Sequence, residues 1–100
     1  MSKERENFID KYIKDAFFWI RNEEESEFIQ GVLIEFGLCN PIGEKSPIKY
    51  SDKLTNICTF NPDIHHKTIY FQRADVWLPN ARYREPVDYE QFYYDYFSID

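Results

Sequence analysis

Apolar residues at helical spacing dominate the first fifth of the chain. Their intervals of three and four residues are typical of an amphipathic helix and predict one helix over residues 3–22. These positions are Phe8, Ile9, Tyr12, Ile13, Ala16, Phe17, Trp19 and Ile20. On a helical wheel they cover an arc of about 180°, wider than a helix on an open surface needs. Phe18 departs from the pattern and falls on the opposite, charged side.

A second stretch, residues 26–36, returns to helical spacing after the polar run that starts at Asn22. Its helical positions are Phe28, Ile29, Val32, Leu33 and Phe36. Gly37 follows directly, where a helix C-terminus favours glycine. We therefore expect a helix, although Gly31 weakens the case. The alternation of apolar residues over 32–36 also fits a strand, so strand is the alternative.

The middle of the chain predicts a loop followed by β-structure. Residues 38–53 gather prolines and other turn formers, which favours a loop. Residues 54–60 and 67–78 are rich in β-branched and aromatic side chains, and the turn formers at 61–63 lie between them. This order predicts a β-hairpin or a small antiparallel sheet, with a bulge near 72–75 where the apolar positions change face.

The stretch YEQFYYDYF, residues 89–97, carries six aromatic side chains in nine positions. As a helix it places five of them in one stripe, which predicts a core face. Tyr94 lies outside the stripe, flanked by Glu90 and Asp95 on the remaining surface. The preceding Pro86 and Asp88 are typical of the start of a capped helix.

The order of these elements predicts a single α+β domain over residues 1–100, with two N-terminal helices, a hairpin or small antiparallel sheet, and an aromatic-rich C-terminal helix. A chain of 100 residues is long enough to fold as one domain without metal or disulfide. Aromatic residues make up 19% of the sequence, so we expect large, stiff side chains to build much of the core.

Charge is distributed unevenly along the chain. The net charge is −6 in total, with −4 over residues 1–40, +3 over 41–84 and −5 over 85–100. Binding to a phosphate backbone needs clustered lysine and arginine, so direct nucleic-acid binding is disfavoured. Two acidic ends favour a protein partner with a basic surface.

No stretch reaches the length of a membrane span, and the first ten residues are charged rather than apolar. We therefore expect a cytoplasmic protein. Its two cysteines, Cys39 and Cys58, are then expected to be reduced.

Candidate chemistry is sparse. Glycine-rich phosphate loops and nucleophile motifs are absent from the sequence, which contains three glycines. His65 and His66 are adjacent and would point to opposite faces of an extended segment, so a metal site with Asp63 or a cysteine fits poorly. Cys58 with either histidine is the one conceivable nucleophile and base pair. We expect no cofactor, no metal and no catalysis.

The residues left over suggest a contact surface. Phe18 and Tyr94 are aromatic side chains on otherwise polar faces, and aromatic residues often anchor interfaces. The acidic residues beside them complete the predicted surface. The candidate partner-binding residues are Phe18, Glu23, Glu24, Glu25, Glu90, Tyr94 and Asp95.

We interpret the chain as a non-catalytic protein-binding module. Its most concrete form is an acidic inhibitor or immunity-type protein, from a toxin–immunity locus or a phage, that occludes a basic site of a nuclease or defence enzyme. The alternative is a scaffolding subunit that forms a homodimer through the wide stripe of the first helix and Phe18. A third hypothesis is a small metal-binding protein or enzyme that uses His65, His66 or Cys58.

Overall fold

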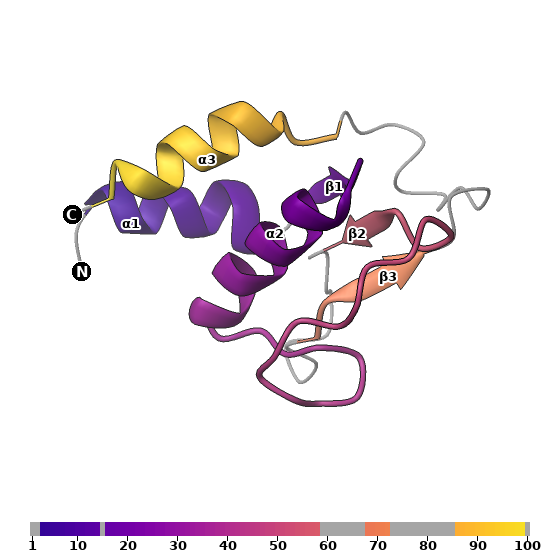
Figure 1. Cartoon of the computed structure of the whole chain (residues 1–100). Helices are drawn as coiled ribbons and strands as arrows, with labels where there is room; N and C mark the ends of the chain where they lie inside the picture. Colours follow the sequence, from indigo (N-terminus) through magenta and orange to yellow (C-terminus); the bar gives the residue numbers. More distant parts are fainter. Residues whose placement is uncertain (1–2, 15, 59–67, 73–85, 100) are drawn as a thin grey trace.

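The computed structural model describes residues 3–14, 16–58, 68–72 and 86–99. In chain order these residues form α1 (Lys3–Phe8), the π-helix η1 (Ile9–Ile13), β1 (Phe17–Trp19), α2 (Glu23–Glu35), β2 (Asn56–Cys58), β3 (Tyr70–Gln72) and α3 (Tyr89–Phe97). Figure 1 shows α3 running alongside α1, α2 below them, and the strands on the side of α2 away from α1. Helices and strands therefore share one small domain. None of the described helices is long and apolar enough to cross a membrane.

The first helix ends much earlier than the sequence pattern indicates. It continues from α1 into η1, stops at Ile13, and is followed by a strand that starts at Phe17. Burial alternates through this strand, with Phe18 buried, Phe17 half-buried and Trp19 exposed. An alternation of period two is the mark of a strand, and aromatic residues favour it. The prediction of one helix over 3–22 is therefore wrong beyond Ile13.

The second predicted helix is confirmed as α2, and the strand alternative is wrong. The helix begins before residue 26 because Asn22 caps it: the side-chain oxygen of Asn22 accepts a hydrogen bond of 2.9 Å from the backbone N–H of Glu25. It ends at Glu35, and Gly37 follows two residues later with a φ of 104°. The N–H of Leu38 then donates to the carbonyl of Leu33, which closes the helix in a Schellman motif.

Three short strands pair in the order β1-β2-β3, all antiparallel. In register, Phe18 lies beside Ile57 and Ile57 lies beside Phe71. This row faces the core: Phe18 and Ile57 are fully buried, and Phe71 packs against the buried cluster. The predicted turn at 61–63 and most of the predicted strand over 67–78, with its bulge, lie outside the described residues. The hairpin therefore stays a prediction.

The core is built largely from aromatic rings, as the composition predicts. Phe92 of α3 is completely buried. Its ring centroid lies 5.6 Å from that of Phe8, 5.0 Å from that of Tyr12 and 5.1 Å from that of Phe18. One side chain of α3 thus contacts α1, η1 and β1 together.

The segment between α2 and β2 is irregular, as predicted for residues 38–53, and two buried amides hold it in place. The Asn40 side chain accepts hydrogen bonds from the backbone of Ile42 and Glu44. Gln30 of α2 exchanges two hydrogen bonds with the backbone of Ile48, at 2.8 and 3.1 Å. The loop is therefore anchored to α2 by side-chain to backbone hydrogen bonds.

Candidate protein-binding surface

Helix α3 carries aromatic side chains on its solvent side as well as in the core. Phe92 points inward and is completely buried, as predicted for the aromatic stripe. Tyr93 is 47% exposed and Phe97 is 62% exposed, so the prediction that they belong to the core is wrong. Tyr94 is 68% exposed, as predicted. Three aromatic rings on one helix therefore reach solvent.

Tyr93 and Phe97 remain exposed because α2 covers only part of this side of α3. Phe28 of α2 packs against this side of α3, with its ring centroid 4.9 Å from that of Tyr93 and 6.0 Å from that of Phe97. Phe28 is itself only half-buried, so one ring cannot cover both neighbours. Positions three and four apart are neighbours on a helix surface, and Phe97 lies three positions after Tyr94 and four after Tyr93. The ring centroids of Tyr93 and Phe97 are 4.8 Å apart. Tyr93, Tyr94 and Phe97 therefore form a continuous surface, which we call the aromatic patch.

Exposed carboxylates lie on α3 next to the aromatic patch and at the start of α2. Glu90 lies one turn before Tyr93 and Tyr94 on α3 and is exposed. Glu23 and Glu24 are exposed in the first turn of α2. We call these three glutamates the acidic rim.

The acidic start of α2 acts electrostatically on the start of α3. The pKa of Tyr89 is raised, first by burial and then by the negative charges of Glu25 and Glu24. Like charges disfavour ionisation of the phenol. The ring centroid of Phe28 on α2 lies 5.9 Å from that of Tyr89, so the first part of α2 lies beside the start of α3. The acidic rim therefore spans both helices.

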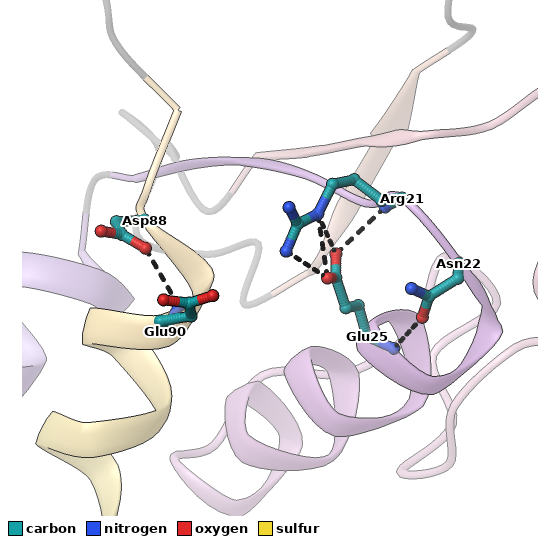
Figure 2. A network of polar contacts seen from close by, with 5 residues as sticks. All are labelled: Arg21, Asn22, Glu25, Asp88 and Glu90. Atoms are coloured by element: carbon teal, nitrogen blue, oxygen red, sulfur yellow. Dashed lines mark hydrogen bonds and ion pairs between the residues drawn. The ribbon is translucent and has the colours of Figure 1, made fainter.

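Glu25 does not belong to the exposed surface, contrary to the prediction. It is 5% exposed, and its carboxylate accepts hydrogen bonds from Nε and Nη2 of Arg21, at 2.9 and 2.6 Å (Figure 2). The pKa of Arg21 is raised, chiefly by this hydrogen bond and charge, against burial, with smaller contributions from Glu90 and Asp88. A carboxylate held this way by its own chain is not available to a partner.

Asp95 also turns away from the predicted surface. Its carboxylate accepts hydrogen bonds from the hydroxyl of Tyr12 and from the side-chain amide of Gln91. Nζ of Lys11 lies 3.5 Å from Oδ2 of Asp95. Lys11 and Tyr12 both belong to η1, so Asp95 faces η1. Successive helix positions differ by about 100°, and Tyr94 faces solvent. The predicted grouping of Asp95 with Tyr94 and Glu90 is therefore wrong.

Phe18 is a core residue rather than a contact residue. It is 1% exposed, and its ring meets that of Phe92 edge-on at 5.1 Å. Its odd position on the helical wheel arose because this segment is a strand. The prediction of Phe18 as an exposed aromatic is therefore wrong.

Trp19 is the exposed aromatic side chain that the helical interpretation missed. It is 59% exposed and lies on the outer face of β1, opposite Asn56 in register. A strand interpretation would have found it, because alternate residues of a strand share a face. Together with Arg21 and residues 86–90, Trp19 lines a pocket of about 360 Å³.

Most residues named in the metal-binding and enzymatic hypotheses lie outside the described residues. Asp63, His65 and His66 are outside the described residues, as is the side chain of Cys58. Within the part of the chain that the structure describes, no group of three or more histidine, cysteine or acidic side chains could hold a metal ion. Sγ of Cys39 lies 3.8 Å from the hydroxyl of Thr68. The redox state of the cysteines stays a prediction.

Comparisons with protein-family models, with curated proteins and with solved structures give no match. The chemistry of the surface therefore carries the functional proposal for this chain.

Proposed function

We propose that this small α+β domain is a non-catalytic module that binds a basic protein partner through the aromatic patch and the acidic rim. In its most concrete form it is an acidic inhibitor or immunity-type protein that occludes the basic site of a nuclease or defence enzyme. One observation carries the proposal: Tyr93, Tyr94 and Phe97 are between 47% and 68% exposed on neighbouring positions of one helix.

The aromatic patch has the chemistry of an interface anchor. Contiguous exposed apolar surface is unusual on a monomer and commonly marks a contact site. Tyrosine is enriched among the residues that dominate binding energy, because it buries a large area with few rotatable bonds. The side chain of Phe97 has no polar group that can form a hydrogen bond with water. A partner that covers it therefore removes apolar surface from solvent, which is favourable.

The acidic rim sets the chemistry of the partner. The last sixteen residues carry five acidic and no basic side chains. Complementary charge speeds the encounter of two proteins and rejects partners of like charge. A basic groove that normally binds nucleic acid has the required sign.

The homodimer hypothesis loses its main support. It depended on a wide apolar stripe of the first helix and on an uncovered Phe18. That helix stops at Ile13, and Phe18 is buried inside the domain. An isologous dimer through the aromatic patch would also bring two copies of the acidic rim together, which is unfavourable. A heterologous basic partner avoids this repulsion.

Site-specific photo-crosslinking in extracts of the native host tests the proposal. A benzoylphenylalanine placed at position 94 should crosslink to a basic protein. The same group at position 42 is the control, because Ile42 is 73% exposed and lies on the loop after α2. Equal labelling from both positions, or crosslinking at position 94 to a second copy of this chain alone, would contradict the proposal.

A further inference from the structure

The pocket beside the acidic rim is lined by aromatic, apolar and charged residues. It lies between the end of β1 and the start of α3. Its lining residues are the exposed Trp19, Arg21, the apolar Pro86 and Val87, Tyr89, and the acidic Asp88 and Glu90. Its volume of about 360 Å³ is near the lower end of the roughly 300 to 1,000 Å³ typical of ligand pockets. One amino-acid side chain fits such a space.

The charge of this pocket is negative once its internal pairing is taken into account. Arg21 is the cation among its described lining residues, and Glu25 engages that guanidinium through two nitrogens (Figure 2). Asp88 uses one oxygen to cap α3, in a hydrogen bond of 3.0 Å to the N–H of Glu90. Among the described residues Arg21 acts on Glu90 through its charge, but no hydrogen bond or ion pair joins a cation to the carboxylate of Glu90. Two carboxylates therefore remain to attract a positive charge.

We propose that this pocket receives one arginine side chain of the partner protein, with the guanidinium stacked on Trp19 and hydrogen-bonded to Glu90. Arginine suits this lining better than lysine, because its flat guanidinium stacks on an indole ring and presents several N–H donors to a carboxylate. This assignment rests on the proposed function. It adds that an arginine of the partner anchors the complex in this pocket. It also gives Trp19 a role that the helical interpretation of the sequence could not suggest.

The test needs no partner protein. N-acetyl-L-arginine amide is titrated into ¹⁵N-labelled protein, and the Trp19 indole N–H signal is followed by NMR, after assignment with Trp19→Phe. We expect saturable binding with a dissociation constant of about 1 to 10 mM, the range of one cation–π contact with flanking charge. N-acetyl-L-citrulline amide has nearly the same shape without the charge and should bind at least about tenfold more weakly.

Matched variants locate the site. Trp19→Ala and Glu90→Gln should each weaken binding of the blocked arginine several-fold, whereas Glu44→Gln, on the exposed loop after α2, should leave it unchanged. Equal binding of arginine and citrulline amides, or tighter binding of N-acetyl-L-lysine amide, would overturn the assignment. Tighter binding of free arginine than of the blocked form would assign the pocket to an amino acid rather than to a protein partner.

The outcome is separable from that of the proposed function. If the blocked arginine fails to bind but crosslinking at position 94 captures a basic protein, the pocket assignment is wrong and the proposed function stands. If it binds with the expected selectivity and no basic protein is captured, the proposed function fails and the pocket remains an arginine site.

Discussion

Phe92 and Tyr94 lie two positions apart on α3 and have opposite environments. Phe92 is completely buried against three aromatic rings, whereas Tyr94 is 68% exposed. Phe92→Ala should lower the free energy of unfolding by about 3 to 5 kcal/mol, because it removes a large ring and leaves a cavity. Tyr94→Ala should change it by no more than about 0.5 kcal/mol. Denaturant titration of both variants measures this, and equal losses would contradict the orientation of α3.

Asp95 gives the protein an acid-dependent contribution to stability. Burial raises its pKa, but hydrogen bonds from Tyr12 and Gln91 and the charge of Lys11 together lower it below the usual value. A carboxyl whose pKa is lowered by folding stabilises the protein above its unfolded pKa of about 3.9, and this contribution disappears as the pH falls through the folded value.

Asp95→Asn should therefore be less stable than the wild type at about pH 5 and should lose less stability between about pH 5 and pH 2. Denaturant titrations across this range measure the difference. Asp52→Asn is the control, since Asp52 is an exposed residue of the loop before β2. Its free energy of unfolding should change with pH nearly in parallel with that of the wild type. Identical acid dependence in wild type and Asp95→Asn would show that Asp95 does not stabilise the fold.

At the scale of a single element, substitutions at two glycines test the structure of α2. Gly31 lies exposed within the helix, and a Cβ added there meets no atom within 4 Å. Gly31→Ala should therefore raise the free energy of unfolding by about 0.5 to 1 kcal/mol. A Cβ at Gly37 also meets no atom within 4 Å, but Gly37 adopts a φ of 104° just after the C-terminal end of α2. Gly37→Ala should therefore lower the free energy of unfolding by about 1 to 2 kcal/mol. Thermal or denaturant unfolding that moves both variants in the same direction would contradict this helix end.

Sequence reasoning succeeded where local signals and tertiary packing agree. The spacing from Phe28 to Phe36, followed by Gly37, predicted α2, and Asp88 marked the start of α3. It failed after Ile13, because the apolar positions that follow fit a wide helical stripe as well as a strand. The pairing of β1 with β2 decides between the two, and a partner strand some forty residues away leaves no mark on the local pattern.

The candidate surface was predicted in part. Tyr94, Glu23, Glu24 and Glu90 are exposed as expected. Which other side chains accompany them depends on how much of α3 is covered by α2 and α1, and a helical wheel does not contain that information. Another set of exposed aromatic side chains was therefore missed, namely Trp19, Tyr93 and Phe97.

For the whole molecule, the account predicts a monomer in isolation. Phe18 is covered internally, and self-association through the aromatic patch would oppose like charges. Size-exclusion chromatography with light scattering should give a mass near 12.2 kDa at micromolar concentration and physiological salt. A tight dimer that Tyr94→Ala or Phe97→Ala dissociates would instead support the scaffolding alternative.

The most direct test of the central claim is the salt dependence of association with the crosslinked basic partner, measured by surface plasmon resonance. Raising ionic strength from 0.1 to 1 M shortens the Debye length from about 10 Å to about 3 Å and should slow association of the wild type steeply. The double variant Glu24→Lys with Glu90→Lys should associate several-fold more slowly at low salt, with a flatter salt dependence. Tyr94→Ala should mainly speed dissociation, and Glu44→Lys should resemble the wild type. Binding that is insensitive to salt and to all of these changes would contradict the proposed function.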